Sequence, residues 1–398
     1  MPSPTSHCGP LQGLRVIEMA GIGPAPFCGM LLADMGADVI VIERPAALKA
    51  LNTGEAMNRG KRSIRLDLKQ DAGLQAAIAL INDAAVLIEG YRPGVMERLG
   101  LGPAVFEGGN PRLVYGRVTG WGQTGPLAQA PGHDINYVAL TGIASLSARP
   151  GNAPSVPATV IGDMAGGGMF LAFGLLCAIL ESQHSGRGQI VDAAMIDGVG
   201  TLSALIHSMR GNGLWPTEDA HNLFMHRSPF YDAFECADGG FITLAAIESQ
   251  FFKEMLRLLE LGDVNPASQF DTSQWPALRA RVAERIRSRT RSEWIQRLEG
   301  SDACFAPILS LDEAAQHPHQ QARGNFFRVK DQWQPAASPR FSRSQPRTPQ
   351  ASPVAGSHTQ EVLAALGLPP ELIAQACALE TAAGKCVARG KEVCAHQT

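Results

Sequence analysis

The stretch LRVIEMAGIGPAPFCGMLLADMGADVIVIE, residues 14–43, holds two short segments that are apolar along most of their length. Residues 14–19 and 38–43 are such segments, as the strands of a buried parallel sheet require. Between them lie a Gly/Pro-rich turn at 21–26 and a short helical pattern at 27–35, which ends at Gly36. This order predicts a compact βαβ unit.

The same alternation continues along the chain. We expect further strands at 85–88, 113–119 and 189–195, and helices at 72–82, 134–147 and 164–182. Strands that alternate with helices predict an α/β fold with an open, Rossmann-like sheet, whose ligands lie beyond the carboxyl ends of the strands.

A different pattern begins after residue 223. Residues 230–236 and 241–245 flank an Ala-Asp-Gly-Gly turn and predict a hairpin, and amphipathic helices are expected at 249–261, 276–289 and 291–299. These elements predict a small α+β domain. Residues 333–356 read as an extended crossing segment, and helices are expected at 359–366 and 370–379.

The composition excludes several classes of protein. Of the 398 residues, 45% are hydrophobic, and 34 basic side chains nearly balance 37 acidic ones, so no general attraction to nucleic acid or membranes is expected. Eight scattered cysteines without C-x-x-C spacing favour reduced thiols and give no metal site. The start lacks the pattern of a signal peptide, so a cytoplasmic location is expected. The uncharged run 164–180 is expected to be a buried core helix rather than a membrane span.

The turn after the first strand imitates a dinucleotide-binding motif. Gly21 and Gly23 are followed about twenty residues later by Glu43. The third glycine of that motif would fall at Pro26, and Pro24 removes another N–H that should face a pyrophosphate. We therefore do not expect a nicotinamide or flavin cofactor.

Three side chains are candidates for chemistry. Asp163 opens the glycine-rich stretch 162–168, where exposed N–H groups could hold an oxyanion, although an aspartate there is also an ordinary helix cap. His133 stands where a long Gly/Pro loop meets a helix, and imidazole groups suit proton transfer near neutral pH. Glu248 follows the hairpin at a helix start, where an acidic residue also suits the helix dipole.

Basic residues gather near the ends of the predicted strands. Arg44, Arg92 and Arg98 are the best candidates to bind the phosphates of a cofactor or substrate at this rim, and Arg59, Lys61 and Arg62 are weaker ones. The alternative for the 59–62 group is a solvated surface.

Seven motifs in order resemble the family III CoA-transferase superfamily, and within it the α-methylacyl-CoA racemase branch, over residues 10–380. They lie at 13–18, 32–39, 91–95, 120–126, 132–137, 162–163 with 188–193, and 246–248. The resemblance implies an interlocked homodimer of two-domain subunits. It places the large, CoA-binding domain at 1–195, a linker at 196–223, the small domain at 224–316 and a return segment at 317–380, with a tail at 381–398.

The resemblance also implies roles for the candidate residues. His133 and Asp163 would be two bases on opposite faces of an α-carbon, His133 serving the S and Asp163 the R substrate, and the N–H groups of the glycine-rich helix would hold the enolate oxygen. Glu248 of the other subunit would orient His133, and Tyr137 would join the CoA contacts. The implied function is racemisation of 2-methyl-branched acyl-CoA thioesters in lipid metabolism, with CoA as part of the substrate and no separate cofactor.

Two alternatives stay open. Transferases of the superfamily use the residue that matches Asp163 as a nucleophile, which carries CoA through a covalent intermediate, and a silent thioester-binding protein is a third interpretation. The chain also departs from the racemase pattern. Thr159 stands where an Asn is common, and residues 225–229, Met-His-Arg-Ser-Pro, replace a Gly-Gly-Ala-Pro-type loop. These departures bear on the substrate more than on the chemistry.

Overall fold

The computed structural model describes residues 9–44, 54–149, 151–216, 221–346 and 349–377. They fall into two compact units. The first comprises the described parts of Met1–Ile143, Val156–Leu202 and Phe327–Thr398, and the second comprises those of Ala144–Ser155 and Ser203–Phe326. The expected linker 196–223 is divided between the units after Leu202. The expected tail 381–398 lies outside the described residues.

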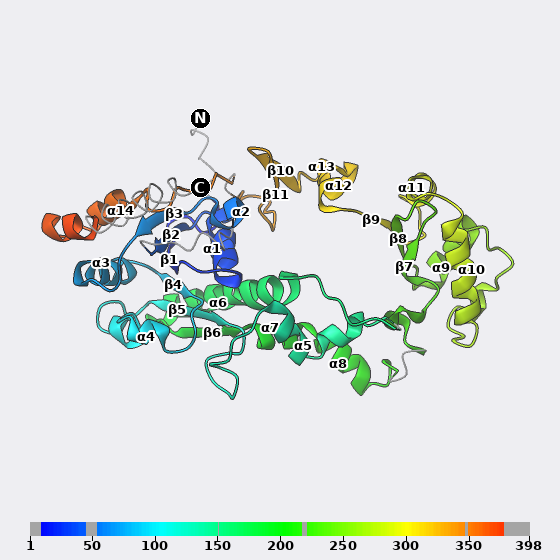
Figure 1. Cartoon of the computed structure of the whole chain (residues 1–398), viewed down its shortest axis with the longest axis horizontal. Coiled ribbons are helices and arrows are strands. Elements are labelled where there is room, and N and C mark those ends of the chain that lie inside the picture. The colour runs from blue at the N-terminus through cyan, green and yellow to red at the C-terminus, as the bar shows by residue number, and fades with distance from the viewer. Residues whose placement is uncertain (1–8, 45–53, 150, 217–220, 347–348, 378–398) are drawn as a thin grey trace, which may run out of the picture. The chain divides into compact units, whose positions relative to one another are not determined.

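The first unit is built on six parallel strands in the order β3-β2-β1-β4-β5-β6 (Figure 1). The strands are β1 (Arg15–Met19), β2 (Asp38–Glu43), β3 (Arg62–Arg65), β4 (Val86–Glu89), β5 (Val114–Thr119) and β6 (Ile190–Ala194). This order belongs to the doubly wound, Rossmann-like sheet, and it reverses between β1 and β4. The predicted α/β fold is confirmed, with β3 as an additional strand.

Helices cover both faces of this sheet. In the first unit they are α1 (Pro24–Asp34), α2 (Gly54–Asn58), α3 (Asp71–Asn82), α4 (Val95–Arg98), α5 (Asp134–Leu140), α6 (Phe170–Ser185), α7 (Met195–Leu202) and α14 (Thr359–Ala365). Alternate residues of each strand enter two separate cores, as the two-residue period of a strand requires. Ile17 and the strand residues on the same face of the sheet pack with α3 and α14. Val16 and the strand residues on the opposite face pack with α1 and α6.

The turn expected at 21–26 is shorter in the structure, because α1 already begins at Pro24. Proline fits the first helical position, where its fixed φ is suitable and its missing N–H would have no partner in any case. Gly23 takes the N-cap position with φ 70°. The backbone at this point is therefore one that glycine adopts more readily than other residues do.

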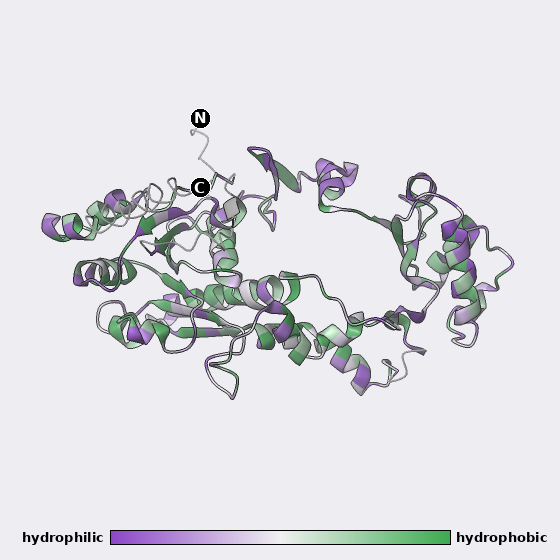
Figure 2. Cartoon of the chain, in the orientation of Figure 1, coloured by the Kyte–Doolittle hydropathy of each residue, from purple (hydrophilic) through white to green (hydrophobic). Residues whose placement is uncertain are grey.

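The helix expected at 164–182 begins earlier and has two parts, a π-helical turn at Val160–Met169 and then α6. One face of α6 is buried against the sheet through Leu171 and Leu175, but its other face exposes Phe173 and Leu180. Hydrophobic residues make up most of this helix (Figure 2). Within the described residues, Val160–Ser185 is long and apolar enough to cross a membrane, and 39% of its most apolar window is buried. The expectation of a buried core helix is thus correct for one face of α6, and its other face is exposed.

The second unit contains an antiparallel sheet in the order β7-β8-β9, with β7 (Tyr231–Glu235), β8 (Phe241–Ala245) and β9 (Phe305–Ile308). Its helices are α8 (Ala204–Gly211), α9 (Ser249–Leu258), α10 (Trp275–Arg287), α11 (Arg291–Leu298), α12 (Leu311–Gln316) and α13 (Pro318–Ala322). A two-stranded sheet, β10 (Phe326–Val329) and β11 (Gln332–Pro335), follows in the chain, and from Phe327 on it belongs to the first unit. The predicted hairpin and the three amphipathic helices after it are confirmed.

Candidate active site

The candidate site lies in the first unit, where the strand order reverses. Gly23 follows β1, and a Cβ atom built on it would come within 3.4 Å of Asp163 Oδ2. The Asp163 carboxylate therefore lies against the backbone at the N-terminus of α1. In a dinucleotide-binding sheet this place holds a pyrophosphate. Here a side chain of the protein occupies it, in keeping with the incomplete motif in the sequence.

The surroundings of Asp163 favour its neutral form. Its pKa is raised to about 6, chiefly by burial and then by the neighbouring carboxylate of Asp134, while His133 acts in the opposite direction. The start of α1 offers few hydrogen bonds to compensate, since Pro24 and Pro26 have no N–H. A carboxyl group that titrates near neutral pH is suited to accept and return a proton.

His133 immediately precedes α5, which packs against the π-helical turn that carries Asp163. Its side chain is exposed, and its backbone N–H donates to Asn136 Oδ1 at 3.0 Å. Because His133 is the residue directly before α5, it stands near the turn that carries Asp163, and its charge lowers the pKa of Asp163. The structure thus brings together the two residues predicted to be bases.

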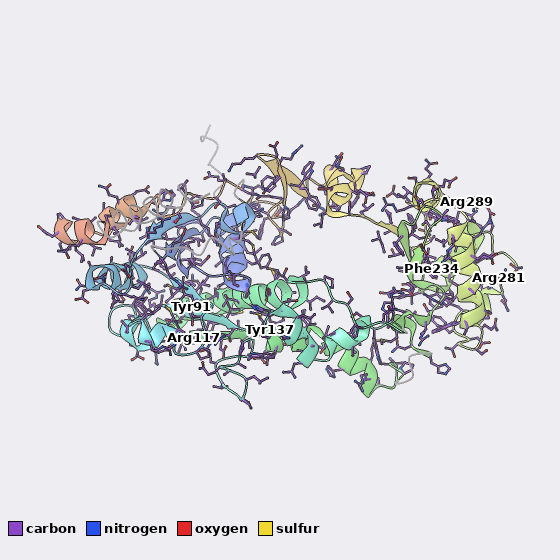
Figure 3. The ribbon with its side chains drawn as sticks, in the orientation of Figure 1. Tyr91, Arg117, Tyr137, Phe234, Arg281 and Arg289 are labelled. Carbon is purple, nitrogen blue, oxygen red and sulfur yellow. The ribbon has the colours of Figure 1, made fainter. Side chains whose placement is uncertain are left out.

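Tyr137 fixes the loop that leads to His133 (Figure 3). Its hydroxyl donates to the carbonyl of Gly132, and its ring meets Trp121 edge-on at 4.7 Å. A Cβ atom on Gly120 would lie 2.0 Å from the Tyr137 ring, so this packing requires a glycine there. The pKa of Tyr137 is raised by burial and by Asp163 and lowered by Arg92. Tyr137, predicted as a CoA contact, therefore has an internal hydrogen bond and a buried ring.

The expectation that N–H groups of the glycine-rich helix hold an enolate oxygen needs correction. The N–H of Asp163 donates to Asp134 Oδ1 at 2.8 Å, and the N–H of Met164 donates to the Thr159 carbonyl at 3.1 Å. These donors are engaged because the helix begins with a π-helical turn at Val160 rather than with a free N-terminus. Thr159, one of the two departures noted above, adopts a left-handed backbone with φ 64°.

The glycines of this turn have a packing role. A Cβ atom on Gly167 would lie 2.9 Å from Pro24, and one on Gly198 in α7 would lie 1.9 Å from the Gly166 carbonyl oxygen. Without side chains the π-helical turn can touch both α1 and α7. This close approach holds Asp163 over the end of β1.

Three of the predicted basic residues are exposed at the same edge. Arg44 follows β2 and lies over the Tyr91 ring, 5.9 Å from its centroid. Arg92 follows β4 and is close enough to influence Tyr137, and Arg98 ends α4. The carboxyl ends of parallel strands meet at one edge of a sheet. Arg44 and Arg92 therefore flank the reversal point from two strands.

The other three basic residues have internal partners. Arg59, which is 1% exposed, forms an ion pair with Asp34 at 2.6 Å, and Lys61 forms one with Glu18 at 2.7 Å. Arg62 is partly exposed and pairs with Asp38 at 2.5 Å. Burial removes Arg59 and Lys61 from contact with a phosphate, and the solvated surface considered for this segment is also wrong. The cause is that each cation is matched by a carboxylate distant in the sequence.

A buried charge network beneath the Tyr91–Arg98 segment was not predicted. Glu89, at the end of β4, accepts a hydrogen bond from the Tyr91 N–H at 2.7 Å and lies 3.4 Å from Arg117 Nε. Arg117, which is labelled in Figure 3, also pairs with Glu97 in α4. Burial raises the pKa of Glu89 to about 7. The only sequence signal was a charged residue at the end of one apolar strand, Glu89 in β4, and another inside a second strand, Arg117 in β5.

The second unit contains Glu248 and the unusual loop 225–229. Glu248 is exposed immediately before α9, and its charge helps to raise the pKa of Cys304, after the larger effect of burial. The loop is fixed by the buried carboxylate of Asp232, which lies 3.0 Å from His226 Nδ1 and 2.5 Å from Arg279. Arg149 joins the same carboxylate at 2.7 Å and thereby attaches Ala144–Ser155 to this unit.

Comparison with known proteins agrees with this arrangement. The chain is 39% identical to mouse alpha-methylacyl-CoA racemase over 92% of its length and 95% of the relative, and 37% identical to the human racemase over the same shares. A solved CAIB/BAIF family protein from Brucella suis is 25% identical, with a TM-score of 0.76, over 90% of this chain and 99% of that one. The model of the CoA-transferase family III matches residues 11–359. The chain therefore belongs to CoA-transferase family III.

Proposed function

We propose that this protein is an isomerase that racemises the α-carbon of 2-methyl-branched acyl-CoA thioesters by transferring a proton between two bases. The observation that carries the proposal is Asp163, whose pKa is raised to about 6 and which lies within electrostatic range of His133. The similarity to two named racemases over 92% of the chain supports the same function. Racemisation requires two groups that can accept and return a proton, one on each face of the α-carbon.

The reaction has two steps. One base removes the proton from the carbon next to the thioester carbonyl, which leaves an enolate. The other base, protonated beforehand, then delivers its proton to the opposite face of the same carbon, so that the configuration inverts. His133 serves the S face and Asp163 the R face in this proposal. Burial raises the pKa of Asp163, so its carboxylate accepts a proton more readily than an exposed aspartate does.

The CoA part of the substrate lies, in this proposal, along the carboxyl edge of the sheet. Arg44, Arg92 and Arg98 are exposed there and can pair with phosphate groups. Arg59, Lys61 and Arg62 are omitted because carboxylates of the protein already pair with them. CoA is part of the substrate, and no separate cofactor or metal is needed for proton exchange.

We further infer a homodimer in which Glu248 of the partner subunit orients His133. The exposed apolar face of α6 supports an assembly, because Phe173 is 68% exposed and Leu180 58% exposed on a helix that is otherwise packed on the sheet. Cover by a second copy is proposed in place of insertion into a membrane. A cytoplasmic location and a role in lipid metabolism complete the proposal, and no nucleic-acid partner is expected.

The proposal is tested by incubating the purified protein with one enantiomer of a 2-methylacyl-CoA in D₂O. Racemisation predicts loss of optical purity together with uptake of one deuterium at the α-carbon, which mass spectrometry detects. The alternative, a CoA-transferase with Asp163 as nucleophile, predicts transfer of CoA to an added carboxylate without deuterium uptake. That second result would contradict the proposal.

The shared site is tested by mixing two inactive variants, His133→Ala and Glu248→Ala. If Glu248 acts across the dimer, one of the two sites in a mixed dimer is intact, and up to about half of the activity of that dimer should return. Subunit exchange is verified by native mass spectrometry with one variant isotopically labelled. Exchange without any recovery would contradict the shared site.

A further inference from the structure

Asp134 directly follows His133 and reaches across to the helix that carries Asp163. Its Oδ1 atom accepts the backbone N–H of Asp163 at 2.8 Å. It is the first residue of α5, yet only 6% of it is exposed. An aspartate that merely favours the helix dipole can remain in solvent. This one is buried against the residue that we propose as a base.

The contact depends on the residue before Asp163. A Cβ atom on Gly162 would lie 2.6 Å from Asp134 Oδ1 and 3.1 Å from the Asp134 carbonyl oxygen. Gly162 is itself buried. The carboxylate of Asp134 therefore fills the space that any larger residue at position 162 would take.

The second carboxylate oxygen of Asp134, Oδ2, differs from Oδ1 in its surroundings. Within the described residues, Oδ2 is buried and has no hydrogen-bond partner. A buried carboxylate oxygen without a donor keeps its charge poorly screened, so that it acts strongly on neighbouring groups. The nearest consequence is at Asp163, where Asp134 adds to the rise in pKa caused by burial.

Within the described residues, Asp134 and His133 are the charges that act on the pKa of Asp163. His133, immediately before α5, lowers this pKa, and α5 itself contributes Tyr137. The start of α1 contributes Gly23, which is uncharged. From α7, which packs against the same π-helical turn, comes Asp197, whose side chain is exposed. Arg92 acts on Tyr137. The carboxylate of Asp134 is thus the repulsive charge at the site.

We propose that Asp134 is a positioning residue for the reaction: its Oδ1 fixes residue 163 through the backbone, and its unpaired charge keeps the Asp163 carboxylate basic. The inference rests on the proposed function, since it assigns Asp134 to the support of one of the two bases. Two adjacent residues at the start of α5 then have different roles. His133 is one base, and Asp134 controls the other base, Asp163.

The test compares pH profiles of kcat/KM for racemisation of the R enantiomer, the substrate for which Asp163 is the base, in the wild type, Asp134→Asn and Gly162→Ala. Asparagine keeps an oxygen that can accept the Asp163 N–H but removes the charge, so the acid limb should move to lower pH by about 0.5–1 unit. The plateau should fall by roughly 3- to 10-fold, because a weaker base removes the proton more slowly. Gly162→Ala displaces the same carboxylate from the other side and should move the limb in the same direction.

Asp197→Asn is the matched control, since it removes one negative charge from a helix that touches the same turn. Its acid limb should stay in place. An unchanged limb in folded Asp134→Asn would overturn the inference, and so would an equal shift in Asp197→Asn. If Asp134→Asn does not fold, the limb of Gly162→Ala decides in the same way. A wild type that exchanges no α-proton would instead refute the proposed function, so the two failures are distinguishable.

Discussion

Two charged regions of the first unit differ in how their charges are balanced. In the segment 59–62, Arg59 and Lys61 are buried and each meets a carboxylate, Asp34 and Glu18, at 2.6 and 2.7 Å. At the sheet edge, Asp163 lies beside another carboxylate, Asp134. Burial raises the pKa of Glu18, Asp34 and Asp163 alike, but the paired cations lower it for Glu18 and Asp34, whereas Asp134 raises that of Asp163 further. Matched buried charges hold the chain in one arrangement, whereas unmatched charges keep a proton exchangeable. The difference separates a structural role from a chemical one.

The matched region should be the more sensitive to loss of one partner. Lys61→Met leaves Glu18 buried without its cation, and Glu18 also occupies the space beside Gly29, where a Cβ atom would lie 1.8 Å from Oε2. We expect a loss of about 3–5 kcal/mol in the free energy of unfolding. Denaturant titration measures it. Adding Glu18→Gln should recover much of the loss, and a single variant as stable as the wild type would contradict the structural role.

The loss should also depend on pH. Burial already raises the pKa of Glu18 in the folded state, and loss of Lys61, whose charge and hydrogen bond lower that pKa, raises it further above the unfolded value. Such a group destabilises the fold increasingly as pH rises above the unfolded pKa. The difference between wild type and Lys61→Met should therefore be larger at pH 8 than at pH 5.

At the sheet edge, a single basic residue should affect binding and leave the fold intact. Arg92→Ala removes an exposed guanidinium proposed to pair with a CoA phosphate, so KM should rise about tenfold with kcat nearly unchanged. Steady-state kinetics give both constants, and Arg62→Ala is the control because its side chain pairs with Asp38. Equal effects of the two variants on KM would contradict the assignment of Arg92.

The smallest effect has the opposite sign. Asp163→Asn removes a carboxyl group whose pKa is about 6 in the fold and near 4 when unfolded, so its charge costs stability above the unfolded value. We expect a gain on the order of 1 kcal/mol at pH 8, after allowance for solvent screening, which shrinks towards pH 5. A loss of stability at pH 8 would place Asp163 with the matched, structural charges.

Much of the first unit is predictable from its sequence because β1, β2, β4 and β5 are short apolar runs. The strand β3 was missed because Arg62 and Arg65 stand at its ends, where they suggest a surface. The burial of Lys61 could not be foreseen, since its partner Glu18 lies 43 residues earlier in the chain. Local patterns identify strands, but they do not report pairs that form only when strands assemble.

The candidate site shows the same limit. The motifs around His133 and Asp163 point to the two residues, but neither motif indicates that Asp134 contacts residue 163, which is 29 positions away. The glycine run was expected to expose N–H donors. It instead allows the π-helical turn to pack against α1 and α7. The sequence thus predicted which side chains form the site. It did not predict that the backbone N–H groups of the glycine-rich turn are engaged within the protein.

The most direct test of the two-base account uses His133→Ala and Asp163→Asn, each incubated in D₂O with the R and the S enantiomer of a 2-methylacyl-CoA. Circular dichroism first verifies that both variants are folded. Neither variant should racemise either enantiomer. Each should exchange the α-proton only of the enantiomer served by its remaining base, R for His133→Ala and S for Asp163→Asn. Full racemisation by either folded variant would contradict the account.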